Sequence, residues 1–147
     1  MNNLFDIEDG MIMEYFGDCE ELVIPDGVRD IFFQVFMYNI KITKVTIPGS
    51  ISDLTASTFA GCPALREAIL REGVKLIEFG AFEECEKLES VTLPKSLREI
   101  QKNAFKGCTV LREIRYCGSR EDWNGVIKGE DWDKDTGEYK IIFDLNV

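Results

Sequence analysis

The chain has 147 residues, of which 45% are hydrophobic, so it is long enough for one domain with a substantial core. Its 27 acidic and 17 basic side chains give a net charge of −10, which repels nucleic acid and anionic membrane surfaces at long range. The chain has no histidine, which excludes imidazole-activated nucleophiles, histidine-based zinc sites and histidine proton shuttles.

The N-terminal stretch MNNLFDIEDG has neither the basic nor the apolar segment of a secretory signal. No apolar run approaches the roughly 20 residues of a membrane span. We therefore expect a cytoplasmic protein without membrane insertion for the sequence as written. If the chain is a piece of a longer protein, we expect a cell-surface or secreted location instead.

Four short segments alternate apolar and polar residues, as strands do. They are ELVIP at 21–25, KVTIP at 44–48, EAILR at 67–71 and LESVTLP at 88–94. Three of them end at a proline, which has no N–H for a further ladder bond and so ends a strand. We expect these strands to lie parallel in one sheet, about 4.8 Å apart.

A short extended piece and then a tight helical turn are expected between successive strands. In AFEECEKL at 81–88, Phe82, Cys85 and Leu88 are spaced by three, which is typical of a tight helical turn. The sequence therefore predicts short helices along the side opposite the sheet.

The whole pattern returns every 23 residues: LTASTFAGCPALREAIL begins at Leu54, IEFGAFEECEKLESVTL at Ile77 and IQKNAFKGCTVLREIRY at Ile100. Residues 23 apart then occupy equivalent places in successive coils, which we call columns. Five columns are apolar: Val28, Ile51, Val74 and Leu97; Ile31, Leu54, Ile77 and Ile100; Phe36, Phe59, Phe82 and Phe105; Cys62, Cys85 and Cys108; and Ile42, Leu65, Leu88 and Leu111. This period predicts a right-handed α/β solenoid like those of leucine-rich repeats, in which each coil needs a neighbour to bury its apolar side.

The segment from 118 to 147 is expected to cap the last coil. Ser119 and Asp122 have the spacing of a capping box, which would place Trp123, Val126 and Ile127 on one side of a short helix. A final strand, YKIIF at 139–143, would cover what remains. The alternative is that Trp123 is a platform for a stacking ligand.

The repeated pattern I-x-x-x-A-F-x-x-C-x-x-L resembles the BspA-like class of bacterial leucine-rich repeats. Residues 1–30 look like the hairpin cap and first strand that precede such repeats, with Asp9 and Gly10 at the hairpin turn. Residues 118–147 are similar to the segment that closes them. The resemblance thus implies a single solenoid domain over 1–147 with repeats at 31–117. For function it implies protein–protein binding or adhesion, frequently at a cell surface, and it carries no catalytic residues.

The cysteines allow three interpretations. Cys62, Cys85 and Cys108 recur in register with the phenylalanine and leucine columns, which favours small buried side chains in a reduced chain. Disulfides between adjacent coils are a second interpretation, although three cysteines in a column leave one unpaired. A thiolate metal site, the third, lacks the usual C-x-x-C spacing. Cys19 and Cys117 lie outside the column and are candidates for partly exposed thiols.

The stretch EDWDKDTGEY at 130–139 suggests calcium, because Asp131, Asp133 and Asp135 alternate. Counted from Asp131, however, Gly137 is at the seventh position instead of the sixth, and the twelfth is Ile142 instead of a glutamate. A solvated acidic loop is the favoured interpretation, and we expect no metal and no cofactor. A carboxylate-based hydrolase that uses Asp131 and Asp133 is a remote alternative.

Two outward columns of the predicted sheet carry charges of alternating sign that should pair along the sheet. The next outward column is the leading candidate for contact with a partner protein: Val23, Thr46, Ile69, Thr92 and Arg115. Val23 and Ile69 should face solvent there, on strands that already supply apolar side chains to the core. The alternative is that isolated exposed aliphatic residues have no binding role.

The coil IFFQVFMYNI at 31–40 departs from the repeat. It has Phe32, Phe33, Met37 and Tyr38 where later coils have polar residues. We expect the N-terminal hairpin to cover these side chains. The alternative, and the second candidate site, is a sticky patch that binds another protein.

The sequence therefore predicts a non-enzymatic protein-interaction module that binds a protein and no nucleic acid. A structural spacer or an adhesion domain of a cell-surface protein is the alternative. No pattern in the sequence specifies the partner's identity or an oligomeric state.

Overall fold

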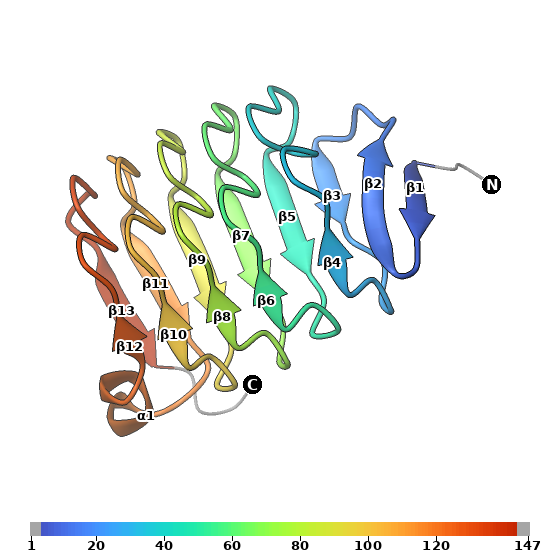
Figure 1. Cartoon of the computed structure of the whole chain (residues 1–147). Coiled ribbons are helices and arrows are strands. Elements are labelled where there is room, and N and C mark those ends of the chain that lie inside the picture. The colour runs from blue at the N-terminus through green and yellow to red at the C-terminus, as the bar shows by residue number, and fades with distance from the viewer. Residues whose placement is uncertain (1–3, 144–147) are drawn as a thin grey trace.

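The computed structural model describes residues 4–143 and shows a solenoid of parallel strands (Figure 1). Residues 1–3 and 144–147, which the sequence assigns to the two caps, lie outside the described residues. The coils stack from an N-terminal hairpin to a C-terminal cap, so that each strand lies beside its equivalent in the next coil. The predicted solenoid is confirmed in its parallel strands and its period.

One long side of the solenoid is a six-stranded parallel sheet in the order β13-β11-β9-β7-β5-β3. Its strands are β3 (Glu21–Val23), β5 (Lys44–Ile47), β7 (Glu67–Leu70), β9 (Ser90–Leu93), β11 (Glu113–Tyr116) and β13 (Lys140–Phe143). From β3 to β11 the register pairs residues 23 apart, as in Lys44 with Glu67 and Glu67 with Ser90. The members of one column deduced from the sequence are therefore neighbours in the sheet.

The opposite side has very short strands at the predicted extended pieces and turns in place of the predicted helices. β6 (Asp53–Leu54), β8 (Leu76–Ile77), β10 (Glu99–Ile100) and β12 (Ile127–Lys128) form a second parallel sheet. The segments expected to be helical, such as 81–88, are non-helical turns. Within residues 4–143 the only helix is α1 (Arg120–Asn124).

The helical prediction is wrong because the backbone becomes left-handed twice in each of these turns. Two columns four residues apart have φ between 59° and 79°: Gln34, Ser57, Gly80 and Asn103, and Tyr38, Gly61, Glu84 and Gly107. A right-handed helix does not pass through such residues. The phenylalanine, cysteine and leucine of each coil therefore keep their spacing of three without a helix.

The core is the stack of the predicted apolar columns. The rings of Phe36, Phe59, Phe82 and Phe105 lie nearly parallel, with centroid distances of 5.3, 5.7 and 5.3 Å. All four rings are completely buried. Each fully buried apolar side chain of this size contributes about 1.5–3 kcal/mol to folding, so stability rises with every coil added to the stack.

The N-terminal cap is the predicted antiparallel hairpin of β1 (Phe5–Glu8) and β2 (Met11–Tyr15). Asp9 and Gly10 form its turn, with φ of 50° and 80°. β2 then pairs in parallel with β4 (Asp30–Ile31). The ring of Tyr15 packs on Phe36 with centroids 5.2 Å apart, so the hairpin closes the N-terminal end of the ring stack.

The C-terminal cap contains the predicted capping box at α1. The N–H of Asp122 donates to Ser119 Oγ at 3.0 Å, and the N–H of Ser119 donates to Asp122 Oδ2 at 3.0 Å. Trp123 and Val126 are buried as predicted, which supports the capping role of Trp123, but Ile127 is 63% exposed. The expectation for Ile127 is wrong because this residue lies in β12 opposite the outward Glu99 of β10.

Candidate functional site

The outward face of the six-stranded sheet carries the column that the sequence selects for partner contact. The register places Val23, Thr46, Ile69, Thr92 and Arg115 in one continuous row. Val23 is 65% exposed on the edge strand β3. Ile69 lies on the same face, but it is partly buried. Both side chains are therefore on the outward face as predicted, but only Val23 is exposed, because Ile69 lines a hollow.

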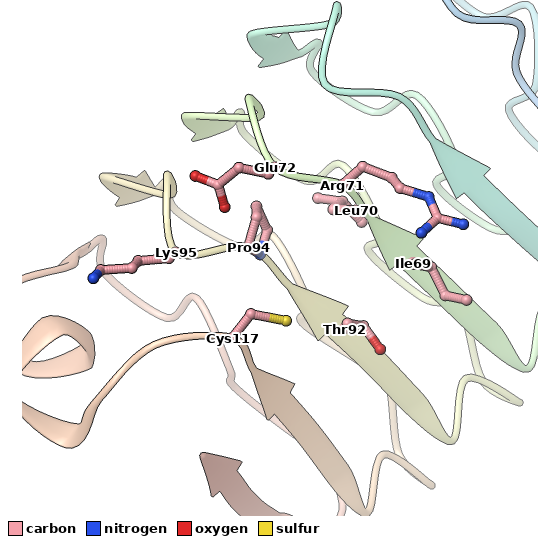
Figure 2. A pocket seen from close by; sticks show the side chains of 8 residues that line it. All are labelled: Ile69, Leu70, Arg71, Glu72, Thr92, Pro94, Lys95 and Cys117. Carbon is pink, nitrogen blue, oxygen red and sulfur yellow. The ribbon is translucent and has the colours of Figure 1, made fainter. Parts of the chain in front are cut away.

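This hollow has a volume of about 410 Å³ and lies over the C-terminal ends of β7 and β9. Figure 2 shows its lining: Ile69, Leu70, Arg71, Glu72, Thr92, Pro94, Lys95 and Cys117. Arg71 and Lys95 mark opposite sides of the hollow, and their charged ends point away from each other. Its volume falls in the range of about 300–1,000 Å³ that is usual for ligand sites. We call it the sheet hollow.

The sheet hollow forms where the column that ends the strands changes its residue type. Pro48, Arg71, Pro94 and Cys117 occupy equivalent positions, so a long cationic side chain and a small thiol flank the compact ring of Pro94. Arg71 also has the N–H that proline lacks, and it donates to the carbonyl of Ile47 at 3.0 Å. The predicted row thus has a local depression, which periodicity alone does not indicate.

The charges beside this row are paired along the sheet, as predicted. Lys44 Nζ lies 3.6 Å from Glu67 Oε1, and the carboxylate of Glu89 lies 4.0 Å from Arg66 and 3.8 Å from Arg112. Exposed pairs of this kind contribute about 0.2–1 kcal/mol each. On the rim of the sheet hollow, by contrast, Arg71 has no ion pair among residues 4–143.

The second predicted site lies on the other side, and the hairpin does not cover it. Phe32 is 50%, Phe33 62% and Tyr38 67% exposed, whereas Met37 is partly buried. The expected cover is absent because β2 adds to the edge of β4 instead of folding over its outer face. Sequence reasoning also missed Phe79, which is 43% exposed and stands two repeats after Phe33 in the same column.

The buried cysteine column has a structural role. Within residues 4–143 no cysteine forms a disulfide, so the disulfide interpretation is wrong. The Cys85 thiol donates to the carbonyl oxygen of Phe59 at 3.1 Å, and Cys62 and Cys108 make the equivalent bonds at 3.2 Å. Burial raises the pKa of Cys62 to about 11 and also raises the pKa of Cys85 and Cys108. These thiols are therefore poor nucleophiles and poor metal ligands.

The acidic segment 130–139 is the last turn of the solenoid. The N–H groups of Phe105 and Gly107 donate to the carbonyls of Trp132 and Lys134, as in the coils before. Asp131 and Asp135 are left-handed, with φ of 56° and 57°, and take the two left-handed positions of the turn. Aspartate tolerates this backbone better than most residues, so the backbone accounts for this spacing of acidic residues.

Asp133, between these two residues, holds the end of the solenoid together. Its Oδ2 accepts a hydrogen bond of 2.7 Å from the hydroxyl of Tyr139. Burial, followed by this bond, raises the pKa of Tyr139. No group of three or more acidic, cysteine or histidine side chains within residues 4–143 is arranged to hold a metal ion. No helix among the described residues has the length and apolar character needed to cross a membrane.

Comparison with known proteins agrees with this architecture. The model of the BspA type leucine rich repeat region matches residues 10–124 with six copies. The structure of a leucine rich cell surface protein from Faecalibacterium prausnitzii is similar, with a TM-score of 0.63 and 29% identity, over 80% of this chain and 38% of that one. The chain therefore spans well under half of that relative's length.

A leucine rich repeat protein from T. pallidum is also similar, with a TM-score of 0.51 and 19% identity, over 92% of this chain and 81% of that one. This second likeness shows the fold alone. No curated protein matches the chain. Because the repeat model covers most of the sequence and the strands repeat in the same register, the chain belongs to the family of BspA-type leucine-rich-repeat proteins.

Proposed function

We propose that this chain is a non-catalytic protein-binding module that contacts its partner through the outward face of the six-stranded sheet. The observation that carries the proposal is the position of the sheet hollow, which includes Ile69 and Thr92 of the predicted column. An open apolar depression beside a row of paired charges suits an apolar anchor of another protein, surrounded by a polar rim.

The chemistry of the lining supports this assignment. Ile69, Thr92 and Pro94 offer apolar surface to a partner's side chain, and burying a leucine-sized group contributes about 1.5–3 kcal/mol. Arg71 and Lys95 on opposite sides favour a partner that is acidic around this anchor. In this interpretation Val23 and Arg115 extend the contact along the row in both directions.

A catalytic role has little support. The lining of the sheet hollow includes one carboxylate, Glu72, and the chain has no histidine to activate a nucleophile. Asp131 and Asp133, the carboxylates of the hydrolase alternative, belong to the last turn of the solenoid, where Asp133 is bonded to Tyr139.

A cell-surface location with an adhesion or spacer role is the second candidate function. It is favoured by the F. prausnitzii relative, which is described as a cell surface protein and is much longer than this chain. The same fold would then separate or display other parts of a longer protein. Altering the sheet hollow would leave such a spacer's function unchanged, and this distinguishes the two candidates.

Site-specific photocrosslinking tests the binding role. A photoreactive phenylalanine analogue replaces Thr92 in the sheet hollow or, as a control, Val110, which is 46% exposed and outside it. Each variant is irradiated in an extract of the organism that encodes the chain. We expect a discrete crosslinked protein from position 92 and none from position 110. Crosslinks of equal yield from both positions, or none from 92, would reject the sheet face as the binding surface.

A further inference from the structure

A hollow of about 300 Å³ lies on the opposite side of the solenoid, near its N-terminal end. Its lining comes from β2, β4 and the segments that follow β4, β6 and β8: Met11, Asp30, Ile31, Phe32, Phe33, Thr55, Ala56 and Glu78. We call it the aromatic groove. It crosses successive coils, which lie about 4.8 Å apart, so it is long enough for two or three residues of an extended peptide.

The walls of the aromatic groove are phenylalanine rings that face solvent. Phe33 and Ala56 line the groove, and Phe79, the next member of their column, is 43% exposed but lies outside the lining. Phe32, one column away, is 50% exposed, and Phe33 is 62% exposed. A gathering of exposed aromatic rings around a depression is typical of a contact surface.

Carboxylates at the aromatic groove favour a positively charged ligand. Asp30 and Glu78 line it, and Asp53 stands one repeat after Asp30. Burial, and then the negative charges of Asp53 and Asp30, raise the pKa of Glu78. The three carboxylates therefore repel one another.

Among the described residues, no salt bridge neutralises these carboxylates. Among residues 4–143 none of the three carboxylates has a lysine or arginine within ion-pair distance. Arg29, which directly precedes Asp30 in the sequence, donates instead to the carbonyl oxygen of Asp9 at 3.0 Å. A cation supplied from outside would satisfy both the carboxylates and the faces of the aromatic rings.

We propose that the aromatic groove binds a cationic, partly apolar segment of a partner protein, in which an arginine or lysine side chain lies next to an aliphatic one. The cation meets Asp30 and Glu78 and the face of Phe32 or Phe33, while the aliphatic neighbour covers Ala56. This contact goes beyond the proposed function, because it uses the side of the solenoid opposite the sheet hollow.

Methionine NMR on the full chain tests the proposal at a defined place. Of the four methionines, Met11 lines the groove and Met37 does not, so the assigned ¹³C-methyl signals of these two give a reporter and an internal control. The probes are three blocked pentapeptides, Gly-Arg-Leu-Arg-Gly, Gly-Arg-Ser-Arg-Gly and Gly-Glu-Leu-Glu-Gly, together with arginine amide. We expect Gly-Arg-Leu-Arg-Gly to shift the Met11 signal in a saturable way and to leave Met37 unchanged. The serine peptide should bind more weakly, and the acidic peptide should not bind.

Matched variants separate a specific contact from general attraction to an acidic chain. Glu78→Gln should weaken binding about three- to tenfold, whereas Glu138→Gln, with the same charge change in an exposed loop, should leave it within about twofold. Phe33→Ala should weaken binding about three- to tenfold, and Val110→Ala should not. Ile69→Asp, in the sheet hollow, should have no effect, so failure here is distinguishable from failure of the sheet-face proposal.

Four results would overturn the inference. They are equal binding of the acidic peptide, equal losses in Glu78→Gln and Glu138→Gln, arginine amide binding as tightly as Gly-Arg-Leu-Arg-Gly, and no saturable shift of Met11 with any probe. The third result would make the groove a site for single cations instead of a protein segment.

Discussion

The thiol of Cys85 donates a hydrogen bond to the carbonyl oxygen of Phe59 in the preceding coil, with a sulfur–oxygen distance of 3.1 Å. The bond joins the cysteine column to the phenylalanine column and recurs in each coil that has both residues. A small apolar side chain would fill the same space, but it would leave that buried carbonyl without this donor. The cysteine column therefore contributes both packing and a hydrogen bond between coils.

The first prediction concerns this bond. Cys85→Ala removes the sulfur atom and the donor from a completely buried position, and we expect it to lower the free energy of unfolding by about 1–3 kcal/mol. Urea denaturation followed by circular dichroism measures this loss. The control is Cys19→Ala, at a partly exposed cysteine outside the column, which should cost less than about 0.5 kcal/mol. Equal losses in the two variants would contradict the role of the column.

The second prediction is a loss of stability at high pH. Burial raises the folded-state pKa of Cys62 from 9.0 to about 11, so the folded chain holds this proton more tightly than the unfolded chain. The stabilisation is complete below pH 9.0 and is lost as the pH rises through about 11. The loss for this thiol should be about 1–3 kcal/mol.

Urea denaturation at about pH 8 and about pH 10.5 measures this dependence in the wild type and in Cys62→Ala. Because the variant has no thiol at this position, its stability should fall less over the same interval. The stability difference between the two proteins should therefore narrow as the pH rises. An unchanged difference would show that the Cys62 thiol is not responsible for the effect.

The third prediction concerns the left-handed backbone of the turns. Glu84 has φ of 61°, while Gly61 and Gly107 occupy the equivalent positions in the adjacent coils with φ of 65° and 79°. Glu84→Gly should raise the free energy of unfolding by about 0.5–1 kcal/mol, because glycine adopts this backbone without strain. Glu86→Gly, two residues away and also exposed, should lower it by about 0.5–1 kcal/mol, because φ is not positive there. Thermal denaturation of the two variants should give shifts of opposite sign.

The sequence predicts the strands and the buried columns well, because a strict period repeats the same packing problem in every coil. The turns are harder to predict, because non-glycine residues such as Ser57, Glu84 and Asn103 take left-handed positions that composition does not reveal. The sequence does not indicate that the acidic loop at 130–139 is also the last turn of the solenoid, because Asp131 and Asp135 stand 28 residues after Asn103 and Gly107 instead of 23. The last coil is longer than the others, so its residues fall out of step with the 23-residue period.

The sequence likewise predicts some features of the candidate site and not others. Periodicity places Ile69 and Thr92 side by side on the sheet face, and the register confirms this. The sheet hollow depends on the sizes of Arg71, Pro94 and Cys117 at one column, and a repeat pattern does not encode a depression between unlike residues. The exposure of Phe33 likewise depends on how β2 pairs with β4, which the hairpin sequence does not specify.

The fourth prediction addresses the central claim, which is that the sheet hollow contacts a partner protein. The most direct measurement is affinity capture from extract and culture medium of the organism that encodes the chain. The wild type, Ile69→Asp and Val110→Asp are compared, and the retained proteins are identified by mass spectrometry. Both substitutions place a carboxylate at an aliphatic position, but only Ile69 lines the sheet hollow.

We expect one protein to be retained by the wild type and by Val110→Asp and to be lost, by about tenfold or more, with Ile69→Asp. Circular dichroism should be unchanged in both variants. Equal retention by all three chains, or retention of no protein by the wild type, would contradict the claim that the outward face of the six-stranded sheet is a protein-binding surface.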